Sequence, residues 1–193
     1  MTIEPSPLAT AELNPLHAQQ KDAYGTPELH DVAYRIVDTH DWPLLLAATP
    51  AGLVRVAYAV ENHDAVLDRL AADIRPRILA APARLGTAAR QLDEYFRGTR
   101  TTFDLPLDLT LARGFRREVI THLPGYGRTA SYAEVAAVAG SPRAVRAVGT
   151  ACATNPLPVV LPCHRVVRSD GDLGRYVGGV EAKRALLRLE TAA

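Results

Sequence analysis

The spacing of apolar residues changes near the middle of the chain, and this change constrains the fold more than any other feature. In the first part, three short apolar runs begin at Ala33, Pro43 and Leu53, with turn-forming residues between them. Apolar runs joined by short turns are typical of antiparallel strands that follow one another in a sheet. From Leu111 onward the apolar residues recur every three or four positions, which indicates helices. The sequence therefore predicts an α/β protein in which a small sheet-containing domain precedes a mainly helical one.

We place the N-terminal α/β domain at residues 31–107. It contains the three strands and two further segments, residues 63–74 and 84–98, whose apolar spacing predicts amphipathic helices. The preceding residues 1–30 hold four prolines and no sustained apolar period. This composition predicts a flexible leader with a short helical piece at residues 13–20.

The C-terminal domain, residues 108–193, begins with a predicted helix at residues 115–123. Ser131 and Glu134 have the spacing of a capping box, in which each side chain bonds the backbone N–H of the other residue, so a second helix begins after Ser131. Gly140 marks the end of that helix. A third helix follows after a short turn. The order of helix, short turn and helix predicts a helix-turn-helix within a winged-helix-like domain.

The third helix is rich in small residues and carries two arginines. We expect Ser141 to cap it and Pro142 to lie in its first turn. Arg143 and Arg146 are three positions apart and so share one face. A thin, basic helix fits the minor groove of DNA, which is about 6 Å wide, although a tightly packed core helix with two exposed arginines explains the same residues. The small residues are Ala144, Ala147, Gly149, Thr150 and Ala151.

Charge is distributed unevenly along the chain, although the net charge is only +1. Residues 1–111 carry 10 Lys and Arg against 15 Asp and Glu, whereas residues 112–193 carry 12 against 6. This asymmetry indicates that the C-terminal half meets a polyanion, or that the two halves attract each other. No apolar run approaches the roughly 18 residues of a membrane span. The two cysteines, Cys152 and Cys163, fit a reducing cytoplasm better than a disulfide framework.

Cys163 and His164 are neighbours in the apolar segment VVLPCHRVV, residues 159–167. A free thiol, with a reference pKa of about 8.5, is a weak nucleophile at neutral pH, and a neighbouring imidazole base corrects this. Pro162 gives the cysteine a stiff, extended entry. Adjacent side chains of an extended segment point in opposite directions, so the pair works only where the chain turns or a water bridges the two groups. The alternative is an inert core cysteine.

Residues 146–167 and 171–190 together resemble the active-site region of the O6-alkylguanine-DNA alkyltransferases. The first stretch reads RAVGTACATNPLPVVLPCHRVV and the second GDLGRYVGGVEAKRALLRLE. The resemblance implies an N-terminal domain of the ribonuclease H type. It also implies DNA repair, in which the alkyl group of O6-alkylguanine, and of O4-alkylthymine, moves to Cys163 in a single turnover. Double-stranded DNA would be bound through its minor groove, with the damaged base flipped out of the stack.

The resemblance also assigns roles to single residues. His164 acts as a base through a water, and Glu190 orients it. Tyr132 donates to a ring nitrogen of the damaged base, and Asn155 braces the turn before the site. Arg146 fills the gap left by the flipped nucleotide. The other residues of the DNA-binding face are Arg143, Ala144, Ala147 and Thr150, and the pocket for the base and its alkyl group is lined by Tyr132, Cys152, Val166, Tyr176 and Val177.

Two positions depart from the family's pattern. Cys152 lies in the recognition helix where other residues are usual, and Val177 occupies a position usually held by a small residue. The stiff side chain of Val177 is therefore expected to narrow the pocket for bulky adducts. The resemblance implies no cofactor. No metal site is expected either, because no cysteine precedes Cys152 and four histidines lack ligand spacing: His17, His30, His40 and His63.

Two other classes of function remain open on the residues alone. A DNA-damage-binding or regulatory module would use the helix-turn-helix and leave Cys163 unmodified. A thiol hydrolase would use Cys163 on an acyl substrate, but it would have no use for a basic helix-turn-helix. We expect the chain to act as a monomer, with cooperative binding along DNA as an alternative.

Overall fold

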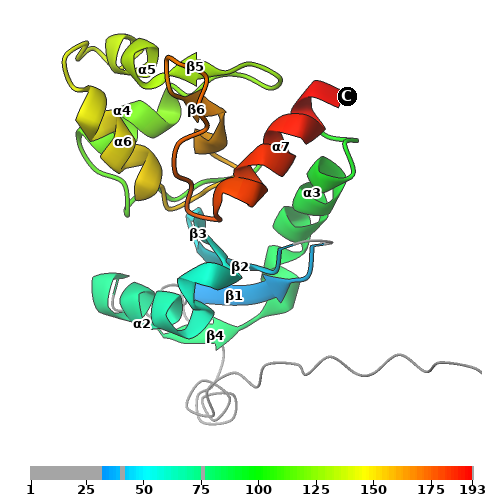
Figure 1. Cartoon of the computed structure of the whole chain (residues 1–193). Coiled ribbons are helices and arrows are strands. Elements are labelled where there is room, and N and C mark those ends of the chain that lie inside the picture. The colour runs from blue at the N-terminus through cyan, green and yellow to red at the C-terminus, as the bar shows by residue number, and fades with distance from the viewer. Residues whose placement is uncertain (1–31, 40–41, 75–76, 193) are drawn as a thin grey trace, which may run out of the picture.

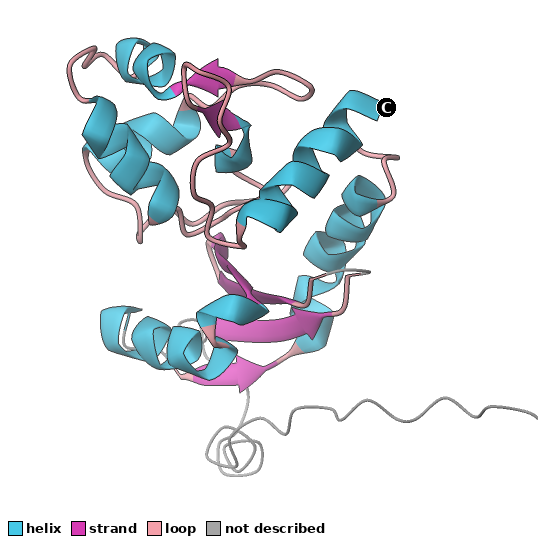
Figure 2. Ribbon diagram, in the orientation of Figure 1, coloured by secondary structure: helices cyan, strands magenta, loops and turns pink. Residues whose placement is uncertain are grey.

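The computed structural model describes residues 32–39, 42–74 and 77–192. The predicted leader with its short helical piece lies outside the described residues, as do His17, His30 and His40. In the described chain, a four-stranded sheet with its helices is stacked against a mainly helical domain, and the last helix, α7 (Val180–Ala192), runs beside α3 (Gly86–Phe96) of the sheet domain (Figure 1, Figure 2). The predicted fold class is confirmed.

Three of the four strands in the larger sheet are those that the sequence predicts: β1 (Val32–Val37), β2 (Leu44–Thr49) and β3 (Gly52–Tyr58). β1 and β3 both pair with β2 in antiparallel fashion. The fourth strand, β4 (Ile78–Ala80), pairs with β1 in parallel and gives the order β3-β2-β1-β4. β4 was not predicted from the sequence, because a run of three residues is too short to show an alternation of apolar and polar side chains.

The two faces of this sheet are covered by different elements, because alternate side chains of a strand point to opposite faces. On one face Leu45 packs with the predicted helix α2 (His63–Ile74), and on the other face Leu46 packs with α3 (Gly86–Phe96). The second face is completed by the C-terminal domain, which contributes five buried residues: Leu157, Val159, Val160, Ala182 and Leu186. Two short 3₁₀ helices lie between these elements, η1 (Ala59–Glu61) and η2 (Pro82–Leu85).

The C-terminal domain is built from short elements around its own small core. Two short strands, one before α5 and one after Cys163, pair in parallel. None of the helices in the described part of the chain is long and apolar enough to cross a membrane. The elements in chain order are α4 (Phe115–Thr121), β5 (Ala130–Ser131), α5 (Tyr132–Val138), α6 (Val145–Ala153), η3 (Cys163–Arg165), β6 (Val166–Val167) and α7 (Val180–Ala192).

The predicted capping box at the start of α5 is confirmed. Ser131 Oγ accepts a hydrogen bond from the Glu134 N–H at 3.2 Å, and the Glu134 carboxylate accepts one from the Ser131 N–H at 2.6 Å. The helix ends as expected near Gly140, which has a φ of +76°. The Gly140 N–H bonds to the Ala137 carbonyl and the Ser141 N–H to the Ala136 carbonyl, which closes the last turn.

The start of α6 differs from the prediction. The helix begins at Val145, so Ser141 does not cap it and Pro142 does not lie in its first turn. Ser141 is instead used to end α5, and the Ala144 N–H bonds to the Ser141 carbonyl at 2.8 Å, which makes these residues a turn. Arg143 lies in that turn, so it does not share a helical face with Arg146 in the way that the spacing suggests.

Strand β3 joins the two domains. The Val56 N–H donates to the Pro156 carbonyl at 2.9 Å, and the Arg55 guanidinium donates to the same carbonyl at 3.2 Å. At the end of the strand the Tyr58 ring lies against Gly178, where an added Cβ would approach the ring to 2.7 Å. The sheet therefore holds both the turn that follows α6 and the glycines that precede α7.

We expect Gly178→Ala to destabilise the protein, because Tyr58 is only 1% exposed and the new methyl group would meet its ring. Overpacking of this kind costs about 1–3 kcal/mol. Urea unfolding measures the loss. The matched control is Gly125→Ala, at a loop position where an added Cβ meets nothing within 4 Å. Equal unfolding free energies for the two variants would show that the contact with Tyr58 does not require glycine.

Candidate active site

The Cys163–His164 pair lies at a turn of the chain, between the helix-turn-helix and β6. Pro162 precedes η3, which consists of one 3₁₀ turn. In such a turn successive side chains are about 120° apart, whereas in a strand they point in opposite directions. Both side chains are buried, since Cys163 is 2% exposed and His164 is 0% exposed. The turn therefore meets the condition under which a neighbouring imidazole can serve the thiol.

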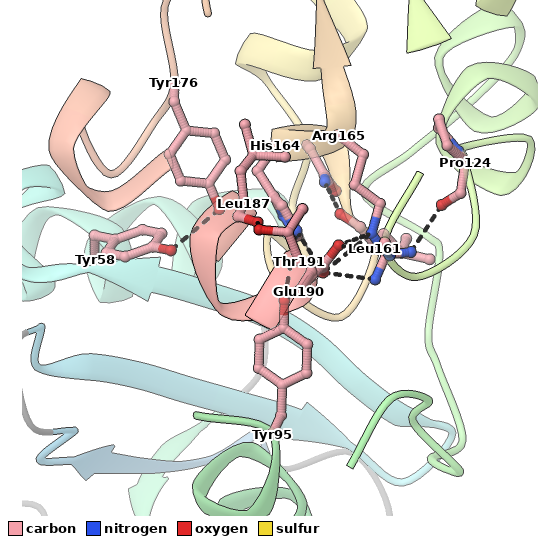
Figure 3. A network of polar contacts seen from close by, with 12 residues as sticks. Tyr58, Tyr95, Pro124, Leu161, His164, Arg165, Tyr176, Leu187, Glu190 and Thr191 are labelled. Carbon is pink, nitrogen blue, oxygen red and sulfur yellow. Dashed lines mark hydrogen bonds and ion pairs between the residues drawn. The ribbon is translucent and has the colours of Figure 1, made fainter. Parts of the chain in front are cut away.

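Glu190 of α7 holds the imidazole by its Nε2 atom, which lies 2.9 Å from Glu190 Oε1 (Figure 3). Arg165 donates to both carboxylate oxygens, and the Gly127 N–H donates to Oε2 at 3.3 Å. Burial would raise the pKa of Glu190, but hydrogen bonds from His164, Arg165 and Tyr95 outweigh it and lower the pKa to about 2. A carboxylate can only accept, so the proton of the neutral imidazole lies on Nε2.

Arg165 connects this carboxylate to the loop that follows α4. Its Nη1 donates to the Pro124 carbonyl at 2.7 Å, and its guanidinium carbon lies 5.7 Å from the centre of the Tyr126 ring. The planar guanidinium bonds the carboxylate through Nε and Nη2 at the same time. This geometry fixes the orientation of the Glu190 carboxylate, and through it the orientation of the imidazole.

The resting charges of the thiol and the imidazole follow from their burial. Burial raises the pKa of Cys163 to about 11, and the opposing influences of Asn155 and Lys183 are smaller. Burial lowers the pKa of His164 by more than the contact with Glu190 raises it. Both groups are therefore uncharged near neutral pH. His164 Nδ1 is buried without a hydrogen-bond partner among the described residues, so its lone pair is available to accept a proton.

Asn155 holds the turn between α6 and Cys163. Its Nδ2 donates to the Leu161 carbonyl at 2.7 Å, and its Oδ1 accepts from the Leu157 N–H at 3.0 Å. The Asn155 side chain is itself buried. These two bonds cross the loop that ends two residues before the cysteine, and so they fix the position from which Cys163 leaves it.

Four of the five predicted pocket residues gather around the thiol. Cys152 and Val166 belong to the same buried cluster as Cys163, and Tyr132 and Tyr176 pack against that cluster. The Tyr176 ring lies nearly perpendicular to the His164 ring, with centres 6.2 Å apart. Burial is the main cause that raises the pKa of Tyr132 and of Tyr176, so both hydroxyls keep their protons at neutral pH.

Val177 is the exception. It packs against the core of the sheet domain, and it lines a cavity of about 330 Å³ between the domains together with Arg55, Asn155 and Pro156. Its side chain therefore belongs to the domain interface and lies outside the cluster around Cys163. Narrowing of the alkyl pocket by Val177 stays a prediction.

The predicted DNA-binding face consists of small and basic side chains on one side of α6. Arg146, Ala147 and Thr150 are exposed on the helix, Ala144 is its half-buried N-cap, and Arg143 is exposed in the preceding turn. Within the part of the chain that the structure describes, neither arginine forms an ion pair. Both guanidinium groups are therefore available to a negatively charged partner.

The N-terminal domain places two buried tyrosines beside this site that were not predicted from the sequence. The Tyr95 hydroxyl of α3 donates to Glu190 Oε1 at 2.6 Å, and the Tyr58 hydroxyl of β3 lies 3.1 Å from that of Tyr176 (Figure 3). No signal in the sequence separates them from other tyrosines, because an aromatic residue in an apolar stripe ordinarily predicts a core position. Chemistry in the N-terminal domain therefore becomes visible only in the folded chain.

Lys183 of α7 is a third residue that sequence analysis misses, although a signal exists. It is 1% exposed, and its Nζ donates to the Val166 carbonyl at 2.6 Å and to the Leu173 carbonyl. Lys183 lies three positions before Leu186 and seven before Glu190, so all three share the buried face of one helix. The ammonium group is thereby held near Cys163, whose pKa it lowers slightly against the larger effect of burial.

A helix that presents small and basic side chains to solvent thus leads, through a braced loop, into a buried thiol that has its own base. This combination defines the class: a DNA-binding protein that uses a cysteine as a nucleophile.

Comparison with known proteins identifies the family within this class. Residues 32–109 match the ribonuclease-like domain of 6-O-methylguanine DNA methyltransferase, and residues 115–192 match its DNA-binding domain. The methylated-DNA–protein-cysteine methyltransferase of Mycobacterium tuberculosis is 36% identical over 162 residues, which cover 82% of this chain and 92% of that protein. This chain belongs to the 6-O-methylguanine DNA methyltransferase family.

Solved structures agree with this assignment. The crystal structure of Mycobacterium tuberculosis O6-methylguanine methyltransferase matches with a TM-score of 0.72 at 36% identity, covering 83% of this chain and 93% of that one. A structure of Mycobacterium tuberculosis OGT in complex with DNA matches with a TM-score of 0.70, at the same identity and coverage. The similarity spans both domains, since it extends over most of each chain.

We expect acid to destabilise the protein, with Glu190 responsible for much of the effect. Its pKa is about 2 in the folded state against a reference value of 4.5. The stabilisation by the carboxylate is therefore complete above pH 4.5 and is lost as the pH falls towards 2, which corresponds to about 3 kcal/mol. Urea unfolding from about pH 7 to about pH 3 will show a smaller pH dependence in Glu190→Gln than in the wild type.

The imidazole contributes in the same direction, because the lowered pKa of His164 also favours the fold at higher pH. The comparison is therefore sharpest below about pH 5, where the carboxylate titrates. Asp93→Asn is the control, since its carboxylate is 54% exposed. If Glu190→Gln and Asp93→Asn kept the same pH dependence as the wild type, the buried carboxylate would not be the source of the acid sensitivity.

Proposed function

We propose that this protein repairs DNA by transferring the alkyl group from the O6 atom of guanine, and from the O4 atom of thymine, to the sulfur of Cys163. The observation that carries the proposal is the buried series Cys163, His164 and Glu190, placed one braced loop beyond the exposed face of α6. Family membership supports it, because the curated relatives are named for methyl transfer from DNA to a protein cysteine.

The transfer begins with proton movement. Because the target atom is buried in the base stack, the damaged nucleotide must first be flipped out of the duplex. His164 Nδ1 then accepts, through a water, the proton that leaves the thiol. Its Nε2 keeps its own proton and continues to donate a hydrogen bond to the Glu190 carboxylate. That carboxylate stabilises the imidazolium, as in a nucleophile–base–orienter triad.

The displacement itself breaks one bond and forms one. The sulfur of Cys163 attacks the alkyl carbon, the new sulfur–carbon bond forms as the carbon–oxygen bond breaks, and the electron pair stays on the oxygen of the base. Tyr132 donates a hydrogen bond to a ring nitrogen of the nucleobase, which favours its departure. The proton that His164 took from the thiol then passes to the departing nucleobase and neutralises it. Val166 and Tyr176 form the wall beside the reacting carbon.

The reaction stops after one turnover. Its product is a thioether, whose carbon–sulfur bond breaks only if a second nucleophile attacks the carbon. Cys152 is in the same buried cluster, but burial raises the pKa of its thiol and its neighbours in the sequence are alanines, so no adjacent imidazole can take its proton. Each chain is therefore consumed by the lesion that it repairs.

The DNA is double-stranded and is bound through its minor groove. A helix face made of Ala144, Ala147 and Thr150 is thin enough for a groove about 6 Å wide. Arg146 enters the stack where the flipped nucleotide was, and Arg143 contacts phosphate. A single chain supplies every group of the proposed reaction, which supports a monomer, and the two free thiols support a reducing compartment such as the cytoplasm.

We expect Cys163, and not Cys152, to carry the alkyl group after incubation with duplex DNA that contains O6-methylguanine. Intact-protein mass spectrometry will show one added methylene per chain in the wild type and in Cys152→Ala, and none in Cys163→Ser. The physical reason is that only Cys163 has an adjacent imidazole base. A DNA-binding module without transfer predicts no mass change in any variant, and a thiol hydrolase predicts turnover of a chromogenic ester instead.

We expect Arg146→Ala to slow transfer from duplex DNA by roughly tenfold or more, because an empty stack leaves part of the unstacking energy, a few kcal/mol, uncompensated. Transfer from free O6-methylguanine base, which needs no flipping, will change by less than about twofold. Single-turnover rates at saturating protein measure both.

Arg143→Ala is the matched control for Arg146→Ala. It removes a phosphate contact, so it will weaken binding and its salt dependence while leaving the rate at saturation unchanged. Equal losses on duplex DNA and on the free base would instead make Arg146 a residue required for folding.

A further inference from the structure

Helix α3 of the N-terminal domain places a hydroxyl group beside the carboxylate that orients the imidazole. Tyr95, near the end of α3, is 0% exposed, and its hydroxyl donates to Glu190 Oε1 at 2.6 Å. The same hydroxyl oxygen lies 3.5 Å from His164 Nε2. In Figure 3, Tyr95 reaches Glu190 from the α3 side while His164 and Arg165 approach from the opposite side.

A single oxygen atom is thereby shared among three residues. Glu190 Oε1 accepts from Tyr95 at 2.6 Å, from Arg165 Nη2 at 2.8 Å and from His164 Nε2 at 2.9 Å. Each donor takes part of the negative charge on that oxygen, so each additional donor weakens the attraction that the carboxylate offers to the others. The Tyr95 hydroxyl therefore competes directly with the imidazole.

We propose that Tyr95 is a positioning residue that limits the basicity of His164 by sharing the Glu190 oxygen on which the imidazole depends. The inference rests on the proposed function, because the basicity of His164 matters only if this imidazole accepts the proton of the Cys163 thiol. It also assigns a part in the transfer to the N-terminal domain.

The benefit of such a contact lies in the resting protein. An imidazole beside a fully available carboxylate becomes protonated more easily, and a protonated imidazole cannot accept the proton of a thiol. By drawing on Oε1, Tyr95 keeps His164 neutral at a lower pH than the pair with Glu190 alone would allow. The hydroxyl itself stays a donor throughout, because burial, followed by the contact with Glu190, raises the pKa of Tyr95.

Removing the Tyr95 hydroxyl deletes none of the other ionisable groups around the imidazole. They come from η3, from the loop before α7 and from α7 itself. A change in the pKa of His164 therefore reports the loss of the hydroxyl and not a rearranged set of charges. These groups are Cys163, Arg165, Tyr176, Lys183 and Glu190.

The packing around Tyr95 makes a clean substitution possible. Its ring contacts those of Phe96, Phe103 and Tyr126, with centres 5.6, 5.2 and 6.3 Å apart. Tyr95→Phe keeps these contacts and removes only the hydroxyl. Tyr126→Phe is the matched control, because the Tyr126 hydroxyl has no hydrogen-bond partner among the described residues, although its ring packs against Tyr95 and Arg165.

The experiment compares the wild type, Tyr95→Phe and Tyr126→Phe in full-length chains. Ring-nitrogen NMR of labelled histidine gives the pKa of His164 directly, and single-turnover transfer from methylated duplex DNA gives the rate from about pH 5 to about pH 8. In Tyr95→Phe we expect the pKa of His164 to rise by about half to one unit. The acid limb of the rate profile will move up by the same amount, with the plateau rate within about threefold of the wild type.

Two results would overturn the inference. One is an unchanged pKa of His164 and an unmoved acid limb in Tyr95→Phe, including the case in which the variant is merely less stable and slower at every pH. The other is an equal upward shift in Tyr126→Phe, which would attribute the effect to general repacking. Absence of transfer by the wild type at every pH would contradict the proposed function instead, and the NMR comparison would still decide whether Tyr95 sets the pKa of His164.

Discussion

The Glu190 carboxylate is the group on which the rest of the structure depends. A buried charge is costly unless hydrogen bonds surround it, and here they come from elements far apart in the sequence: Tyr95 on α3, Gly127 after α4, and His164 and Arg165 on η3. Each of these donors helps to hold α7 in its place, since the loss of one would leave the buried charge less well satisfied. The contact between Tyr95 and Glu190 therefore joins the two domains and also forms part of the candidate site.

The core of the sheet domain also depends on contact between the two domains. One face of the sheet is covered by α2, with Leu111 packed beside it, whereas the other is covered jointly by α3 and by C-terminal residues such as Leu157 and Leu186. Without the C-terminal domain, that second face would expose apolar side chains to water, which is unfavourable in proportion to the area exposed. The backbone bond from Val56 to Pro156 then fixes the turn after α6 against β3. The sheet domain thus acts as a rigid support for the loop that carries the thiol.

Local signals in the sequence predicted local structure well. The apolar runs separated by turn residues predicted β1 to β3, the capping box predicted the start of α5, and the Cys163–His164 neighbours pointed to the candidate nucleophile. Signals that depend on competition between neighbours were misread: Ser141 has the chemistry of a helix cap, but its N–H is already used to end α5. Contacts across the domain interface were not predictable at all, because Tyr58 and Tyr95 acquire their meaning only from what the fold places opposite their hydroxyls. Lys183 is an intermediate case. Its spacing from Leu186 and Glu190 places it on the buried face of α7, but the sequence does not show which carbonyl groups accept its hydrogen bonds.

The same burial that completes the site also explains why its thiol rests in the protonated form. In the proposed single-turnover reaction a permanent thiolate would bring no benefit, because the thiolate is the species that reacts with oxidants and adventitious electrophiles. At a pKa of about 11, the Cys163 thiolate is a minor species at neutral pH, and the neutral His164 holds a lone pair ready on Nδ1. In the proposed reaction, proton transfer from Cys163 to His164 becomes favourable only when an alkylated nucleobase is bound. The negative charge then moves from the sulfur to the departing nucleobase as the alkyl group is transferred. The low dielectric that suppresses the thiolate in the absence of DNA thus favours a reaction whose product is a neutral thioether.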